Sequence, residues 1–132
     1  VLKGKASEAQ QRMWDTVLEA EKRAFRAMKP GQPGAGVYEG TVDFFNESGY
    51  PTKKVKGRNV GFYHGLGHGL GLEVHEALRI RTTDPFKPGQ IFTVEPGLYY
   101  PEIGGCRHED VGVVTEKGFQ VLSKYPKRLE IR

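Results

Sequence analysis

The sequence has a single cysteine, Cys106, among its 132 residues, which excludes a fold that depends on internal disulfides. It also lacks any apolar run near the roughly 18 residues that a membrane-spanning helix needs. The basic segment and short apolar stretch that mark a secretory signal peptide are missing as well. We therefore expect no membrane partner and a location in the reducing cytoplasm.

A concentrated basic surface is also missing, although the formal net charge is +4. Lysines and arginines are scattered along the chain, and they cluster only at Lys53, Lys54, Lys56 and Arg58. Nucleic-acid-binding domains usually gather their basic residues on one face or along one helix. We interpret this cluster as a solvated loop, and we expect no nucleic-acid partner.

The pattern of apolar residues predicts two helices followed by strands, within one domain that spans residues 1–132. Ser7-Glu-Ala-Gln10 has the capping-box pattern, and apolar residues then recur at helical spacing until Pro30-Gly31. After a connection rich in glycine and proline, a second helix is predicted from Val37 to about Ser48. The methionines and aromatic residues on these helices are expected to pack in the core.

Short β-rich runs, separated by glycine and proline, are predicted from Val55 onward. The last two of these runs flank Lys117-Gly118, which has the composition of a hairpin turn. Helices followed by such strands predict the α+β fold class.

Three of the four histidines lie within twelve residues, in His64-Gly-Leu-Gly-His68-Gly-Leu-Gly-Leu-Glu-Val-His75. Imidazole is the commonest transition-metal ligand and titrates near neutrality, so this motif predicts metal binding together with proton transfer. The glycines exclude the helix of a zinc-protease motif, and they place His64 and His68 on a strand or on irregular, closely approached backbone. A dinucleotide-binding loop is also excluded, because Leu70 occupies the position of its third glycine.

Two acidic residues lie further along the chain, on strand-like runs. Glu95 ends the run Ile-Phe-Thr-Val and precedes Pro-Gly, and Glu109 lies in Gly-Gly-Cys-Arg-His-Glu-Asp. Alternation along a strand places Arg107 and Glu109 on one side, and it places His108 and Asp110 on the other. One histidine and two glutamates on neighbouring strands form a plausible site for manganese, cobalt, iron or zinc. We expect His108 to be an ordinary surface or core histidine.

These three motifs, in this order, resemble the C-terminal half of the catalytic domain of pita-bread metallopeptidases. Within that family the resemblance is to the Xaa-Pro dipeptidase (prolidase) and Xaa-Pro aminopeptidase branch, because His64 precedes His68 by four residues and Pro-Gly-Leu-Tyr follows Glu95. The resemblance runs from about residue 7 to the end of the chain. It implies half of a pita-bread (creatinase/aminopeptidase-like) fold, with two helices followed by an antiparallel-rich, curved sheet.

The resemblance also implies roles for particular residues. His68, Glu95 and Glu109 would be metal ligands for two divalent ions in the full enzyme, Mn2+, Co2+ or Zn2+. His64, His75 and Arg107 would contact substrate and assist catalysis, and Glu95 would also accept a proton. The implied reaction is hydrolysis of Xaa-Pro bonds by a metal-bound hydroxide, on peptides with proline at the second position. The full enzyme would be a homodimer.

One departure from the family concerns two further aspartate ligands, which are spaced Asp-x10-Asp. None of the four aspartates in this chain fits that spacing: Asp15, Asp43, Asp84 and Asp110. We therefore expect the chain to be part of a longer enzyme, to hold one ion or none by itself, and to be inactive in isolation. Two alternatives stay open, a non-catalytic pita-bread binding or regulatory module and a creatinase-like, metal-independent hydrolase, although both would be expected to have lost the metal ligands.

Overall fold

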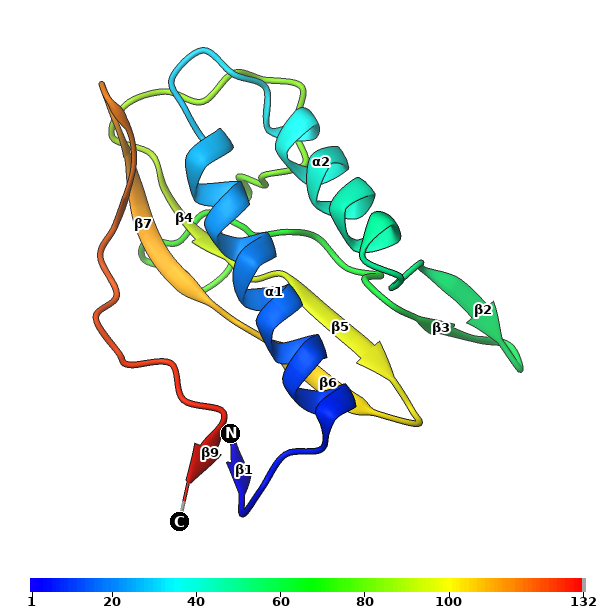
Figure 1. The fold of residues 1–132 in the computed structure, drawn as a ribbon. Helices are drawn as coiled ribbons and strands as arrows, with labels where there is room; N and C mark the ends of the chain where they lie inside the picture. The colour runs from blue at the N-terminus through cyan, green and yellow to red at the C-terminus, as the bar shows by residue number, and fades with distance from the viewer. Residues whose placement is uncertain (132) are drawn as a thin grey trace.

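The computed structural model describes residues 1–131, which fold into two helices and a set of short strands (Figure 1). In chain order, the elements are β1 (Leu2–Lys3), α1 (Glu8–Ala27), α2 (Gly34–Glu47), β2 (Lys53–Val55), β3 (Arg58–Val60), β4 (Ile91–Val94), β5 (Gly97–Tyr100), β6 (Gly104–Arg107), β7 (Asp110–Thr115), β8 (Gly118–Val121) and β9 (Glu130–Ile131). Over these residues, neither helix has the length and apolar character needed to cross a membrane.

The first helix begins and ends where its sequence signals predict. The Ser7 hydroxyl accepts a hydrogen bond from the Gln10 backbone N–H at 3.2 Å, and the Gln10 side chain accepts one from the Ser7 N–H at 2.9 Å. This reciprocal pair satisfies two backbone donors that the first turn would otherwise leave free. The helix ends at Ala27, shortly before Pro30, so the predicted helix is confirmed.

The predicted second helix is also confirmed, as α2, with Pro33 at its N-cap and Ser48 at its C-cap. It lies beside α1, and Figure 1 shows the two helices running over the same side of the strands. A side-chain carbon at Gly34 would overlap the Ile80 carbonyl group, so glycine is required where α2 starts against the following loop.

Most strand pairs are antiparallel, as the sequence pattern predicts. β4, β7 and β8 form one sheet, β5 pairs with β6, and β2 pairs with β3, whereas the terminal strands β1 and β9 pair in parallel. The β7–β8 hairpin turns at the predicted position, because Thr115 pairs with Gly118, whose φ of +136° favours glycine.

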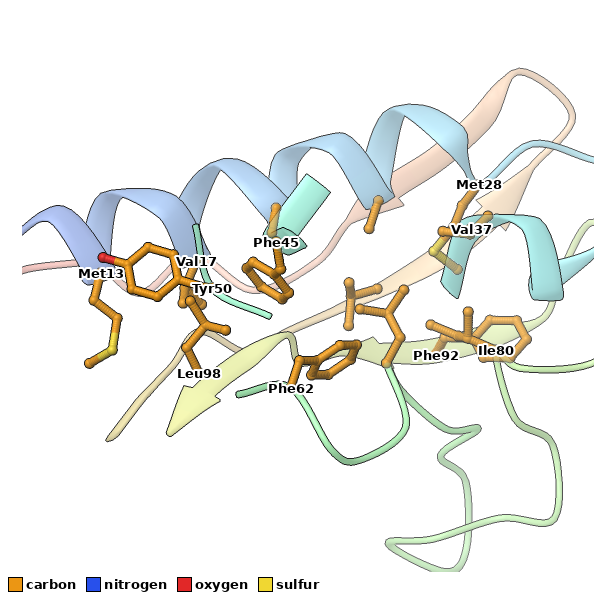
Figure 2. Close-up of a cluster of buried hydrophobic side chains, with 14 of the residues drawn as sticks. Met13, Val17, Met28, Val37, Phe45, Tyr50, Phe62, Ile80, Phe92 and Leu98 are labelled. Carbon is orange, nitrogen blue, oxygen red and sulfur yellow. The ribbon is translucent and has the colours of Figure 1, made fainter. Parts of the chain in front are cut away.

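The core lies between the helices and the strands. Figure 2 shows Val17 and Phe45 from the helices facing Leu98 and Phe92 from the strands, with Phe62 among them. All five side chains are at least 98% buried. The methionine and aromatic residues of the helices are therefore core residues, as expected. Because successive side chains of a strand alternate, the residues between these core positions point to the other face.

The prediction of short β-rich runs from Val55 onward is wrong for residues 61–90. This segment makes only isolated bridges within the described chain, among them Gly61 with Tyr99, His68 with Arg79 and Gly69 with Phe92. The glycines give this segment too little strand preference to continue a ladder, and they let its backbone press against β4 and β5.

Candidate metal centre

His68 is held on irregular backbone against β4, one of the two conformations that the sequence predicts. Its N–H donates to the Thr93 hydroxyl at 3.1 Å, and the Thr93 N–H donates to the His68 carbonyl at 2.8 Å. The imidazole Nδ1 lies 2.9 Å from the Gly69 carbonyl oxygen. Since a carbonyl only accepts, Nδ1 carries a proton, and in the neutral ring Nε2 is then the free electron-pair donor.

Glu95 follows β4 directly and turns its carboxylate toward this imidazole. Its N–H donates to the Leu66 carbonyl at 2.7 Å, which ties the end of β4 to the histidine-containing loop. The Thr93 hydroxyl lies 3.3 Å from Glu95 Oε1, so both side chains occupy the face opposite the core. His68 Nε2 is 3.3 Å from the same Oε1, and the two side chains are only 11% and 15% exposed.

Glu109 lies in the two-residue break between β6 and β7. Arg107 lies on the same side, because its Nη2 is 3.3 Å from Glu109 Oε2 and its Nε is 3.8 Å from Glu95 Oε2. The alternation predicted for Arg107 and Glu109 therefore holds, although the strand is interrupted between them.

One ligand atom from each of His68, Glu95 and Glu109 lies within 4.8 Å of the others, so the structure brings the three predicted ligands together. His68 Nε2 and Glu95 Oε1 lie 3.3 Å apart, so either a proton on Nε2 or a metal cation bound to both atoms would join them. An imidazole whose second nitrogen donates to a carbonyl is also the usual arrangement of a metal-bound histidine. The donor set of one nitrogen and two carboxylates therefore fits a divalent transition-metal ion.

The other predicted site residues surround this group. His64 Nε2 is 3.1 Å from the Tyr99 hydroxyl, and the ring of exposed His75 lies 4.5 Å from the ring of His68. Burial raises the pKa of Tyr99, while the nearby Arg107 guanidinium acts in the opposite direction. Arg107 is thus linked to the two glutamates on one side and, through Tyr99, to His64 on the other.

His108 and Asp110 lie on the side opposite Glu109, as predicted, and the structure shows that this side faces α1. Asp110 Oδ2 is 3.1 Å from Lys127 Nζ, which also lies 2.8 Å from a carboxylate oxygen of Glu21 on α1. Glu21 is 1% exposed, and its burial raises its pKa to about 7. These three residues form the buried charge cluster, which lies directly behind the strand that presents Glu109.

His108 lies in the core, one of the two locations expected for it. Its hydrogen bonding is unusual for a core histidine. His108 is 3% exposed, and its ring packs edge-on against Trp14 with the ring centres 4.1 Å apart. Its Nε2 has no hydrogen-bond partner among residues 1–131. Burial lowers the pKa of His108 to about 4, so the ring is neutral at pH 7.

Sequence reasoning missed four residues that build or support the site: Thr93, Tyr99, Glu21 and Lys127. Period-two alternation from Glu95 would have placed Thr93 and Tyr99 on the ligand face. The helical spacing of Glu21 with Val17 and Ala24 would have shown a carboxylate on the buried face of α1. No sequence signal identifies Lys127, because its partner lies 106 residues away.

Gly67 allows the loop to approach β4 and can be tested directly. A side-chain carbon there would overlap the Thr93 carbonyl group and lie 2.8 Å from Ile80 Cδ1. We expect Gly67→Ala to lower the free energy of unfolding by about 1–3 kcal/mol, as overpacking usually does. Gly65→Ala is the matched control, since nothing lies within 4 Å of the added carbon. Urea unfolding measures both, and equal stability of the two variants would contradict the close approach.

The class of protein follows from a comparison with known families. The model of metallopeptidase family M24 matches residues 1–116. Because this match covers most of the 132 residues, the chain belongs to metallopeptidase family M24.

Comparison with individual proteins shows which members of the family this chain resembles. The chain is 38% identical over 131 residues to the Xaa-Pro dipeptidase of Pyrococcus furiosus, covering 98% of this chain and 35% of that protein. Among solved structures, it resembles the X-Pro aminopeptidase of Thermotoga maritima with a TM-score of 0.87 and 35% identity, covering 99% of this chain and 36% of the other. It resembles the Xaa-Pro dipeptidase of Bacillus anthracis with a TM-score of 0.85 and 39% identity, again covering 99% and 36%.

These comparisons confirm the predicted α+β class and the pita-bread fold of prolidases and aminopeptidases. The chain spans about a third of the length of the relatives that it matches.

Proposed function

We propose that this chain provides metal ligands and substrate-contacting residues to a peptidase that hydrolyses Xaa-Pro bonds, in peptides with proline at the second position. The observation that carries the proposal is the convergence of His68, Glu95 and Glu109 within 4.8 Å, on the face opposite the core. The similarity to Xaa-Pro dipeptidases and an X-Pro aminopeptidase supports the choice of substrate.

In this proposal, His68 Nε2 and the carboxylates of Glu95 and Glu109 hold a divalent ion. When bound, the ion supplies Lewis-acid chemistry, which polarises a peptide carbonyl and lowers the pKa of a water molecule. Glu95 accepts the proton that this water releases, because its carboxylate lies inside the ligand group.

Three further residues position the substrate in this proposal. His64, oriented by the Tyr99 hydroxyl, contacts the scissile carbonyl, and His75 lies beside the metal-binding imidazole on the exposed side. Arg107 orients the substrate or His64, to which it is linked through Tyr99. Its guanidinium also lies near both ligand carboxylates and limits their mutual repulsion.

The metal, the oligomeric state and the location are proposed from the resemblance and from composition. The ions are Mn2+, Co2+ or Zn2+, and two of them act in the complete enzyme. The complete enzyme is a homodimer in the cytoplasm, the location that the single cysteine favours.

Two alternatives are less well supported, a metal-independent hydrolase of the creatinase kind and a non-catalytic binding module. Neither alternative needs three metal ligands at one point. The convergence of His68, Glu95 and Glu109 therefore favours the metallopeptidase.

Calorimetric titration of the chain with Mn2+, Co2+ and Zn2+ tests the proposal. We expect one ion per chain, because the described residues offer one group of three ligands, and we expect His68→Ala to remove this binding. An Ala-Pro dipeptide assay should show little turnover by the 132-residue chain, since two of the five ligands that the resemblance implies are not among its residues. Wild-type affinity in His68→Ala, or rapid turnover by the chain alone, would overturn the assigned roles.

A further inference from the structure

A cavity of about 850 Å³ lies between the β2–β3 hairpin and the β5–β6 pair. We name it the hairpin cavity. Its charged lining consists of three basic residues, Lys53, Lys56 and Arg58, and one acidic residue, Glu102. The lining is therefore predominantly positive, which favours an anionic ligand.

Tyr99 connects the hairpin cavity to His64, one of the residues around the candidate metal centre. Tyr99 lines the cavity, and its hydroxyl is 3.1 Å from His64 Nε2. Tyr63 also lines it, and its ring centre is 5.2 Å from that of Tyr99. A bound peptide that extends from the metal centre past His64 would therefore contact these two aromatic rings before it reaches the basic hairpin.

The hairpin itself is held in place. Val55 pairs with Arg58 across a two-residue turn, and both turn residues, Lys56 and Gly57, have positive φ values of 49° and 80°. Such a turn matches the twist of the strands and joins them tightly. The Tyr100 hydroxyl donates to the Pro51 carbonyl at 2.8 Å, which ties the start of the hairpin to β5.

We propose that the hairpin cavity binds the part of a peptide substrate that extends beyond the proline, and that it prefers acidic residues there. This inference rests on the proposed function and narrows its substrate class to peptides longer than a dipeptide. Ligand cavities of about 300–1,000 Å³ enclose most of a drug-sized molecule, so a dipeptide at the metal centre would leave this one largely empty. The three basic side chains are exposed, so we expect each of them to change the affinity only a few-fold.

The test measures peptide binding to the Zn2+-loaded, 15N-labelled chain by nuclear magnetic resonance. The probes are Ala-Pro-Ala-Glu-Glu-amide and Ala-Pro-Ala-Lys-Lys-amide, which differ only in the sign of the charge beyond the proline. We expect about ten-fold tighter binding of the acidic peptide, with shift changes at Lys56, Arg58 and Tyr63, and a loss of this preference in 0.5 M salt as exposed charges become screened.

Charge-reversal variants locate the effect. The triple variant Lys53→Glu, Lys56→Glu and Arg58→Glu should reverse the preference, and the single variant Lys56→Glu should reduce it by a few-fold. The matched control reverses Lys117 and Lys124, two exposed lysines outside the cavity, and should keep the preference. The dispersion of the amide signals shows whether each variant is folded.

The outcomes separate this inference from the proposed function. If Zn2+ binds but both peptides bind equally, or if the acidic peptide binds the triple variant as tightly as the wild type, the hairpin cavity is not the acidic subsite. Binding of a single-stranded oligonucleotide as tight as that of the acidic peptide would also overturn it. A failure of Zn2+ to bind contradicts the proposed function instead, and this is measured by calorimetry without any peptide.

Discussion

Replacing Glu109 with glutamine is expected to weaken metal binding by more than about 100-fold, the upper range for loss of a partner that only supports a metal ligand. The neutral amide has nearly the shape of the carboxylate, so the fold should persist while one of three ligands loses its charge. In an enzyme that contains this chain, hydrolysis of an Xaa-Pro dipeptide should fall to background. Calorimetry measures the metal affinity, and a dipeptide assay measures the turnover.

The neighbouring residue provides the control. His108→Ala should leave metal affinity and hydrolysis nearly unchanged, because the His108 ring packs against Trp14 on the helix side. Equal losses of metal affinity in Glu109→Gln and His108→Ala would mean that the two faces of this strand have been assigned the wrong way round.

Replacing Lys127 with methionine is expected to lower the free energy of unfolding by about 3–5 kcal/mol at pH 8, the usual cost of removing one partner from a buried ion pair. Glu21 and Asp110 would then face each other without their shared cation. Lys124→Met is the matched control, since Lys124 is exposed, and it should unfold like the wild type.

The loss should depend on pH, and its direction follows from Glu21. Burial raises the pKa of Glu21 from 4.5 to about 7, against the effect of Lys127, and removal of Lys127 raises it further. A carboxyl with a raised pKa stabilises the fold fully below pH 4.5, and this contribution is lost as the pH rises through the folded-state value, at up to about 1.4 kcal/mol per unit. Lys127→Met should therefore be nearest to wild-type stability at pH 4.5 and furthest from it at pH 8.

Chemical denaturation at several pH values measures this difference. His108, whose pKa is lowered by burial and also by Lys127, acts in the opposite direction at acid pH, and removal of Lys127 makes its contribution smaller. Adding Glu21→Gln to Lys127→Met should remove most of the pH dependence. A loss for Lys127→Met that is constant from pH 4.5 to 8 would contradict the role of Glu21.

Local signals predicted the two helices and the last hairpin well. The capping box at Ser7 and the stop before Pro30 act within a few residues, so no tertiary contact was needed to find the limits of α1. The turn before Gly118 was equally local, because its geometry requires a residue that tolerates positive φ.

The arrangement of the site was predictable only in part. Alternation was sufficient to separate Arg107 and Glu109 from His108 and Asp110, even though the strand breaks between them. By contrast, residues 61–90 form only isolated bridges, and their conformation depends on close contacts with β4 and β5. Such tertiary contacts produce no periodic pattern in the sequence.

The buried charge cluster also bears on the order in which contacts form during folding. Lys127 and Glu21 are 106 positions apart, and β1 at one end pairs with β9 at the other. We expect contacts between such distant residues to form late. The entropy cost of closing a long loop comes before the contact can contribute its favourable free energy. The strand end that presents Glu109 thus gains its support after residue 127 has been synthesised and has returned to α1. In small zinc domains the ion organises an unfolded chain. Here the three candidate ligands come together only in the folded chain, so we expect folding to precede metal binding.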